Sequence, residues 1–176
     1  MKFERYNHEI HLRLLYQFMM DPEQQYLFLN HKSCNSLKEF DGWLDGLFRS
    51  FYHEFFLIKD DKNDVAGMIY SYKYSPENGH CHVSVYIPPE YQGSGLGAFA
   101  GLRFLDYLFR NYSLRRVQTE VYAYNTQSLE SQKRCGFEET GRIPEYRYYN
   151  GTYHDLILLS VGRDDFYKKC GIFLKE

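Results

Sequence analysis

The clearest pattern along the chain is an alternation of hydrophobic and polar positions that changes to helical spacing. Residues 80–87 alternate apolar and polar side chains, the period of two that is typical of a half-buried strand. Pro88 and Pro89 follow, and because proline lacks a backbone donor, this pair ends the strand. Apolar side chains then recur every three or four positions over residues 99–109, which predicts a helix with one buried face.

Similar patterns predict elements on either side. Strands are predicted at residues 2–6, 54–59, 65–74 and 115–122, and helices at residues 9–20 and 36–52. Ser36, with Glu39 three residues later, forms the capping box that begins a helix. The strand at 115–122 is expected to pair in parallel with the strand at 80–87, through a right-handed crossover.

The turn between the strand at 80–87 and its helix is rich in glycine, reading QGSGLGA over residues 92–98. Because the first N–H groups of a helix lack internal partners and carry the positive end of its dipole, this turn predicts an anion site. A triphosphate-binding P-loop requires Lys and then Ser or Thr after the last glycine, and Ala98 and Phe99 stand there instead. Residues 93–98 also match the dinucleotide-binding motif GxGxxG/A, and Glu120 follows at about the distance of that motif's acidic residue. In the dinucleotide fold, however, the first glycine follows its strand directly, whereas residues 88–92 intervene here, so the match is weak.

The turn resembles the pyrophosphate loop of the GCN5-related N-acetyltransferases, written Q/RxxGxG/A, with Gln92, Gly95 and Gly97 at the matching positions. A second segment resembles the later half of that family's signature, NxxS followed by a helix and GF. Its matching positions are Asn125, Ser128, Gly136 and Phe137.

Residues 148–161 resemble the closing hairpin of the branch that acetylates ribosomal-protein N-termini and of its relatives. The resemblance to the family covers roughly residues 65–161. It implies an α/β (α+β) acyl-CoA N-acyltransferase fold, with a mixed, mostly antiparallel central sheet of about six to seven strands flanked by helices. Residues 1–176 are expected to form a single N-acetyltransferase domain that ends, over residues 161–176, in a terminal helix or tail.

Composition narrows the class of protein. With 176 residues and 44% hydrophobic content, the chain is long enough to bury a core without a metal or disulfides. With a net charge of −2, the chain has no excess of basic residues that would favour nucleic acid as a partner. No apolar run reaches the roughly 18 residues of a membrane span. The cysteines are scattered without a CxxC pair, which favours reduced thiols in a cytoplasmic protein over a metal site.

The resemblance implies acetyl-CoA as the cosubstrate. The backbone of Val85, Tyr86 and Ile87 is expected to pair with the pantetheine arm as if with another strand. Gln92 either contacts the pyrophosphate or has a structural role, and Asn125 is expected to contact the cofactor arm, cap a helix, or both. The backbone N–H groups expected to hold the pyrophosphate are those of Gly93, Ser94, Gly95, Leu96, Gly97 and Ala98.

The candidates for proton transfer depart from the commonest family pattern. The family's tyrosine on the helix after NxxS would fall at Gln132, which cannot act as an acid. Ser128 matches a serine implied in the ribosomal branch as donor to the thiolate, although an ordinary helix-start serine explains it equally; Tyr124 and Tyr122 are the other candidates. No base is assigned, and deprotonation through water is an alternative to the side chains considered, which are His80, His82, Glu145 and Tyr146.

The resemblance also implies a wall for the acceptor. Phe40, Trp43, Phe48 and residues 26–31 are expected either to line the acceptor pocket or to pack against the sheet. The predicted function is acetyl transfer from acetyl-CoA to a primary amine by direct transfer in a ternary complex. The acceptor is a small-molecule amine or a protein N-terminal amine, and a homodimer is a candidate assembly. Two rivals are a catalytically weak acetyl-CoA-binding member of the fold and an NAD-type dinucleotide-binding oxidoreductase.

Overall fold

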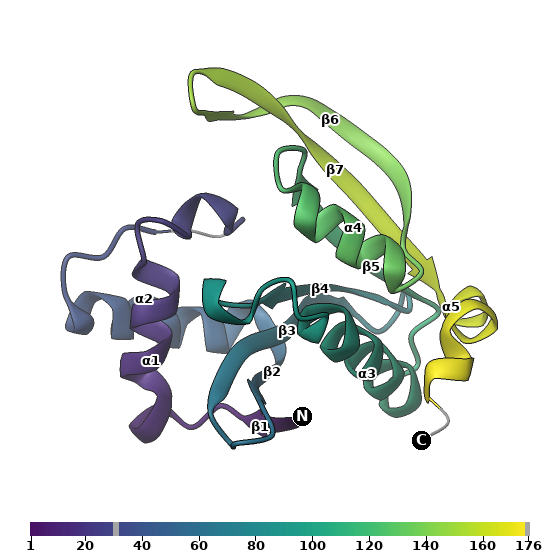
Figure 1. The fold of residues 1–176 in the computed structure, drawn as a ribbon, viewed down its shortest axis with the longest axis horizontal. Helices are drawn as coiled ribbons and strands as arrows, with labels where there is room; N and C mark the ends of the chain where they lie inside the picture. Colours follow the sequence, from purple (N-terminus) through teal and green to yellow (C-terminus); the bar gives the residue numbers. More distant parts are fainter. Residues whose placement is uncertain (30–31, 175–176) are drawn as a thin grey trace.

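A seven-stranded sheet forms the middle of the molecule in the computed structural model, which describes residues 1–29 and 32–174 (Figure 1). The strand order is β1-β2-β3-β4-β5-β7-β6. β4 and β5 pair in parallel, whereas the other neighbouring strands pair antiparallel, which confirms the predicted mixed sheet. The strands are β1 (Lys2–Arg5), β2 (Tyr52–Lys59), β3 (Val65–Ser75), β4 (His80–Tyr86), β5 (Arg116–Tyr122), β6 (Glu138–Tyr149) and β7 (Thr152–Gly162).

Five α-helices and three short 3₁₀ segments accompany the sheet in the described residues. They are α1 (His8–Met20), η1 (Gln25–Leu27), α2 (Leu37–Ser50), η2 (Pro89–Tyr91), α3 (Leu96–Asn111), α4 (Thr126–Arg134), α5 (Arg163–Cys170) and η3 (Gly171–Leu174). The predicted cap of α2 is confirmed, because Ser36 Oγ accepts a hydrogen bond from the Glu39 N–H at 3.2 Å. The Glu39 carboxylate bonds the N–H of Asn35 instead of that of Ser36. Of the predicted terminal segment, residues 175–176 lie outside the described residues.

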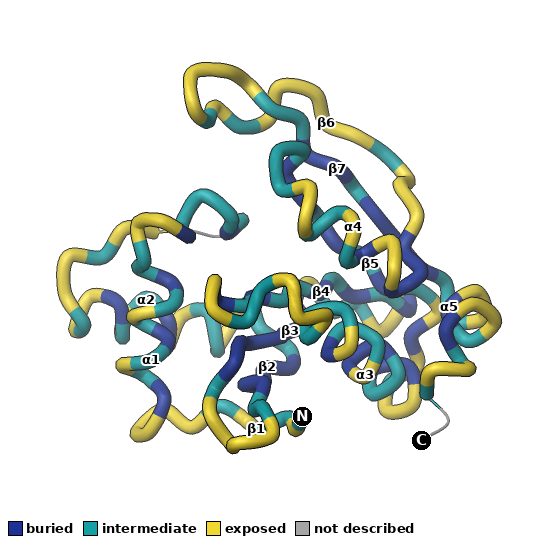
Figure 2. Tube along the Cα trace, viewed as in Figure 1, coloured by how far each residue is buried: buried dark blue, intermediate teal, exposed yellow. Residues whose placement is uncertain are grey.

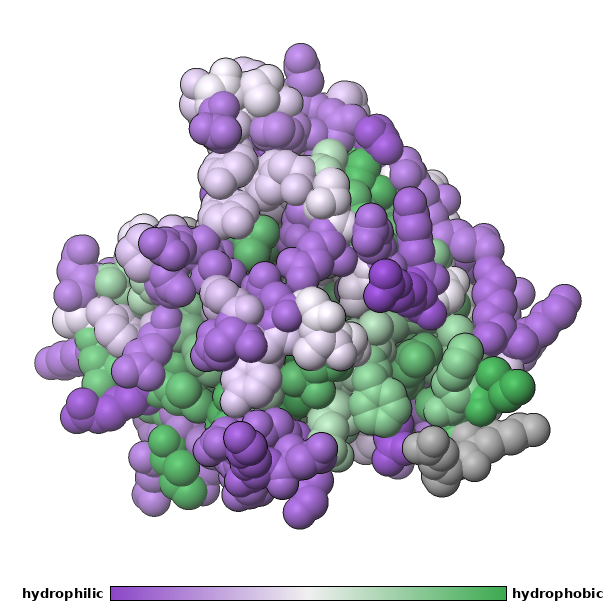
Figure 3. Space-filling model, viewed as in Figure 1, coloured by the Kyte–Doolittle hydropathy of each residue, from purple (hydrophilic) through white to green (hydrophobic). Residues whose placement is uncertain are grey.

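Two hydrophobic cores lie on the two faces of the sheet. α3 packs on one face, where Phe104 contacts a core that includes Val117 of β5. α1 and α2 cover the β1–β3 part of the opposite face, with Leu15 and Phe40 fully buried against it (Figures 1 and 2). Apolar side chains also reach the surface over α3 and η3, as the green area of Figure 3 shows.

The feature that positions the site is the separation of β4 from β5. Their ladder joins residues 80–82 to residues 116–118, and beyond it the two strands diverge, β4 running on to Tyr86 and β5 to Tyr122. A strand that leaves its neighbour presents unpaired backbone groups, so this gap is ready to receive an extended ligand.

Candidate active site

A cavity of about 330 Å³ occupies the gap between the diverging strands. Its wall is built from β4, β5, the glycine-rich turn with the start of α3, α4, and the segment around η1. The structure brings most of the predicted cofactor residues together here. Those on the wall are Val85, Tyr86, Ile87, Gln92, Gly93, Gly95, Leu96, Gly97, Ala98 and Asn125.

The glycine-rich turn has the geometry of an anion site. Gly93 and Gly95 have positive φ angles of 74° and 82°, a conformation that glycine adopts without strain. Gly95 is the N-cap of α3 and has no side chain to cap the helix; the Leu96 N–H donates to Ser94 Oγ at 3.3 Å, and the N–H groups of Gly97 and Ala98 come next in the first turn of the helix. A Cβ built at Gly93 or Gly95 would meet open space, so a phosphate can approach the backbone closely. These features fit the diphosphate of acetyl-CoA.

The polar side chains of this turn serve the turn itself. Gln92 Nε2 donates a hydrogen bond to the carbonyl of Ile87 at 2.9 Å, which ties the turn to the end of β4. The geometry therefore supports a structural role for Gln92, and its pyrophosphate contact stays a prediction. Ser94 lies off the cavity wall, where its hydroxyl donates to the carbonyl of Tyr91 at 2.6 Å.

Asn125 and Ser128 stand together where α4 begins. Asn125 is the N-cap of the helix, and its Oδ1 accepts a hydrogen bond from the Ser128 N–H at 3.2 Å, which confirms the predicted capping role. Both residues also line the cavity. Ser128 therefore lies at the cavity that the predicted cofactor residues line, and its catalytic role stays a prediction.

The two candidate tyrosines are separated by the structure. Tyr122, at the end of β5, lines the cavity, and burial raises the pKa of its hydroxyl. Tyr124 does not line the cavity, because its hydroxyl donates a 2.6 Å hydrogen bond to the carbonyl of Tyr26 and its ring packs 4.6 Å from that of Tyr149. The structure therefore favours Tyr122 over Tyr124 as the alternative to Ser128.

Glu120 on β5 is a cavity residue to which the sequence assigned no catalytic role. Its Oε1 lies 3.0 Å from Lys73 Nζ and 3.6 Å from His82 Nε2, and its side chain is 19% exposed. Burial lowers the pKa of His82 to about 4, so this imidazole is neutral near pH 7. In the sequence Glu120 shares its strand face with Arg116 and Gln118, so no local signal set it apart.

Buried polar atoms without partners lie on the same face of the sheet. In the described part of the chain, Nδ1 of His80, Nδ1 of His82 and the hydroxyl of Tyr72 have no hydrogen-bond partner. Buried polar atoms are normally satisfied by protein or by ordered water. Water molecules bound to these atoms would link Glu120 by hydrogen bonds to the side chains of His80, His82 and Tyr72.

The expected acceptor wall is only partly observed. Leu27, Phe28 and Leu29 line the cavity, whereas residues 30–31 of the same segment lie outside the described residues. The three aromatic residues of α2 take the alternative role: Phe40 is fully buried in the core under α1 and α2, and Trp43 and Phe48 pack against that core.

The hairpin candidates for a base also lie off the cavity wall. Glu145 is exposed, and its N–H donates to Asp155 Oδ1 at 3.0 Å. Tyr146 is 54% exposed, with its ring 6.4 Å from that of Tyr122. Neither is placed to take a proton from a group inside the cavity.

Within residues 1–29 and 32–174, no group of three His, Cys, Asp or Glu side chains is arranged to hold a metal ion. In the same part of the chain, none of the helices has the length and apolar composition needed to cross a membrane.

Comparison with known proteins bears on this site. The family model of the acetyltransferase (GNAT) domain matches residues 2–138. The chain is 24% identical over 135 residues to the SPbeta prophage-derived uncharacterized N-acetyltransferase YokL of Bacillus subtilis, a match that covers 77% of this chain and 74% of YokL.

Two further relatives match shorter stretches. Spermidine N(1)-acetyltransferase of Vibrio cholerae is 27% identical over 101 residues, 57% of this chain and 58% of that protein. The putative ribosomal N-acetyltransferase YdaF of Bacillus subtilis is 29% identical over 97 residues, 55% of this chain and 53% of YdaF. These two matches span little more than half the length of either relative.

Solved structures share the fold. Spermidine N-acetyltransferase from Vibrio cholerae, in complex with CoA and spermine, superposes with a TM-score of 0.83 at 18% identity, covering 94% of this chain and 96% of that chain. The likeness confirms the predicted acyltransferase fold, and the family match confirms the predicted class of activity. The chain belongs to the GNAT family, and it is an acetyl-CoA-dependent N-acetyltransferase.

Proposed function

We propose that this chain transfers an acetyl group from acetyl-CoA directly to a small cationic primary amine, with both substrates in the cavity between β4 and β5. The observation that carries the proposal is the position of Glu120. This partly buried carboxylate lines the same cavity as the turn that is suited to a diphosphate. A carboxylate with little solvent around it attracts an ammonium group more strongly than an exposed one does.

The protein's contribution to cosubstrate binding comes from backbone groups. The N–H groups from Gly93 to Ala98 hold the diphosphate, and the free edge of β4 from Val85 to Ile87 pairs with the amides of the pantetheine arm. Acetyl-CoA supplies a thioester, whose carbon is attacked by an amine nitrogen while the bond to sulfur breaks.

Proton transfer needs a route out of the cavity and a donor within it. The incoming ammonium loses a proton to solvent through water next to Glu120, while His82, whose pKa burial lowers to about 4, stays neutral. The departing thiolate then receives a proton from Ser128 or Tyr122, which both line the cavity. Holding the two reactants together contributes the rest of the rate enhancement.

The choice of acceptor draws on the relatives. Those from Vibrio cholerae and Escherichia coli are named spermidine N(1)-acetyltransferases, and YdaF is named a putative ribosomal N-acetyltransferase. We place a small alkyl amine first, because Leu27, Phe28 and Leu29 give one wall of the cavity an apolar surface. Self-association stays a prediction for this chain; a Vibrio cholerae relative forms a dodecamer.

The test is release of CoA thiol from acetyl-CoA with a panel of amines. Aliphatic mono-, di- and polyamines form one arm, and peptides with a free N-terminus form the other. Turnover with the aliphatic arm is expected, and turnover with peptides alone would contradict the proposed acceptor. Acetyl-CoA is expected to raise the melting temperature, because a ligand that binds only the native state stabilises it, and turnover with neither arm would place the acceptor outside both classes of amine.

A further inference from the structure

Residues 24–29, which we call the η1 strap, are attached to two separate parts of the sheet. At one end the ring of Phe28 lies 5.0 Å from that of Tyr86 on β4. Nearer its middle, Tyr26 stacks on Tyr149 of β6 with ring centroids 4.8 Å apart and planes only 7° from parallel. The η1 strap therefore joins β4 to the hairpin of β6 and β7, the two sides between which the sheet opens.

The hairpin attachment is reinforced by a hydrogen bond. The Tyr124 hydroxyl donates to the carbonyl of Tyr26 at 2.6 Å, and its ring also packs 4.6 Å from Tyr149. His154 of β7 supports the group, with its ring edge-on to Tyr124 at 4.9 Å. We call Tyr26, Tyr124 and Tyr149 the tyrosine clamp.

The position of the η1 strap fixes one wall of the cavity. Leu27, Phe28 and Leu29 follow Tyr26 directly and line the same cavity as Glu120 and Tyr122. A clamp on Tyr26 therefore sets how far these apolar side chains stand from the opposite wall. An alkyl chain can lie along them, because apolar surface favours methylene groups.

We propose that the tyrosine clamp, by holding the η1 strap in place, makes the acceptor site selective for unbranched alkyl amines. The inference rests on the proposed function and adds a determinant of specificity to it. A branched chain is wider than an unbranched one, so it is expected to push the η1 strap away from the opposite wall. Such movement would break both the Tyr26–Tyr149 stack and the hydrogen bond from Tyr124, so branched amines are disfavoured.

The experiment compares two isomeric primary amines, n-pentylamine and neopentylamine, which differ in branching and not in composition. Tyr26→Ala and Tyr149→Ala remove the stack, and Tyr124→Phe removes the hydrogen bond while keeping the ring. Tyr153→Ala is the matched control, because this tyrosine lies on the same hairpin, is 62% exposed and packs on Tyr148, away from the clamp. The measured quantity is the ratio of kcat/KM for the unbranched amine to that for the branched one.

The ratio is expected to fall at least about tenfold in Tyr26→Ala and Tyr149→Ala. A factor of this size is typical of the discrimination in kcat/KM between substrates that differ by a methylene group in an apolar pocket. Tyr124→Phe is expected to lower it by a smaller factor, and Tyr153→Ala to leave it unchanged. KM for acetyl-CoA is expected to stay at the wild-type value throughout, which shows that the variants are folded. An unchanged ratio in both alanine variants of the clamp would overturn the inference.

Hydrogen exchange gives a readout that does not depend on turnover. Backbone amides of residues 27–29 are expected to exchange faster in Tyr149→Ala than in the wild type or in Tyr153→Ala. Equal exchange rates would overturn the claim that the clamp holds the η1 strap. If the wild type turned over neither amine, the proposed acceptor would fail and the selectivity with it, whereas turnover with an unchanged ratio would overturn the clamp alone.

Discussion

Nε2 of His82 lies 3.6 Å from Oε1 of Glu120, beside the point where β4 and β5 separate. Burial is the main cause that lowers the pKa of His82 to about 4; Glu120 opposes the shift, and the charges of Lys73 and His80 add to it. The folded protein therefore keeps this imidazole neutral over a pH range in which an exposed histidine becomes charged.

Stability is expected to depend on pH through this residue. In the unfolded chain a histidine binds a proton near pH 6.5, whereas folded His82 binds one only near pH 4. The unfolded state thus binds more protons, so the contribution of His82 is complete above pH 6.5 and is lost as the pH falls toward 4. Urea unfolding of wild type and His82→Gln from pH 4 to 7 tests this. Equal pH slopes in the two proteins would show that His82 titrates normally.

The glycine-rich turn should lose its ligand when a negative charge is added. Gly95→Asp places a carboxylate where the diphosphate approaches the N–H groups, so acetyl-CoA should no longer raise the melting temperature. Gly95→Asn is the matched control, because asparagine has the same shape without the charge and tolerates a positive φ. The asparagine variant is expected to keep a measurable shift. A folded aspartate variant with the full wild-type shift would rule the turn out as the phosphate site.

The two candidate proton donors can be separated by removing one hydroxyl at a time. Ser128→Ala or Tyr122→Phe, whichever removes the donor, should lower kcat on the order of 10²-fold with little change in acetyl-CoA binding. Tyr124→Phe should retain kcat with unbranched amines, since its hydroxyl is bonded to Tyr26 outside the cavity. A collapse of kcat in Tyr124→Phe would mean that this residue reaches the substrates. Full activity in all three variants would point to water as the donor.

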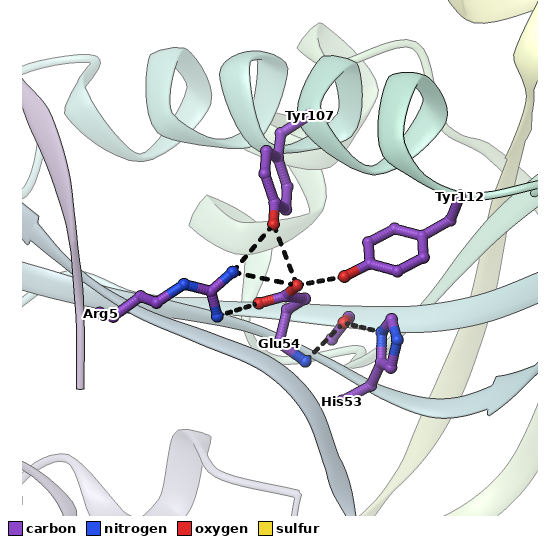
Figure 4. A network of polar contacts seen from close by, with 6 residues as sticks. Arg5, His53, Glu54, Tyr107 and Tyr112 are labelled. Atoms are coloured by element: carbon purple, nitrogen blue, oxygen red, sulfur yellow. Dashed lines mark hydrogen bonds and ion pairs between the residues drawn. The ribbon is translucent and has the colours of Figure 1, made fainter. Parts of the chain in front are cut away.

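A buried polar network behind α3 should affect stability without affecting the site. Glu54 of β2 is 5% exposed and accepts hydrogen bonds from Arg5 at 2.8 Å, from Tyr107 at 3.0 Å and from Tyr112 (Figure 4). Glu54→Gln weakens these charge-assisted bonds, so the free energy of unfolding should fall by about 1–3 kcal/mol.

The control for that variant is Asp61→Asn, which removes an exposed carboxylate that pairs with the N-terminal ammonium. No measurable loss of stability is expected from it, because exposed ion pairs contribute little. Both variants should show the wild-type rise in melting temperature with acetyl-CoA. A Glu54→Gln protein as stable as the wild type would show that the network adds no stability.

Local patterns in the sequence predict most of the fold. The alternation over residues 80–87, the prolines and the helical spacing after them define β4 and α3, because each depends on neighbours in the chain. The capping pattern at Ser36 likewise places the start of α2. The glycine spacing over residues 92–98, between a predicted strand and a predicted helix, likewise predicts the part of the cavity wall that this turn forms.

The remaining features of the site depend on contacts between distant residues. The divergence of β4 from β5 after His82 is a matter of tertiary register, which no local pattern encodes. Tyr124 and Tyr26 are 98 positions apart, so the hydrogen bond that removes Tyr124 from the candidate donors is invisible in the sequence. Glu120 gains its place in the cavity only because the strand beside it moves away.

The most direct test of the account is the effect of Glu120→Gln on kcat/KM for an unbranched primary amine at saturating acetyl-CoA. Glu130→Gln is the matched control, because Glu130 lines the same cavity from α4 but is exposed to solvent. The account predicts a fall on the order of 10²-fold or more in Glu120→Gln, little change in Glu130→Gln, and an unchanged KM for acetyl-CoA in both. Wild-type kcat/KM in Glu120→Gln would contradict the proposal that the amine is bound and deprotonated beside this carboxylate.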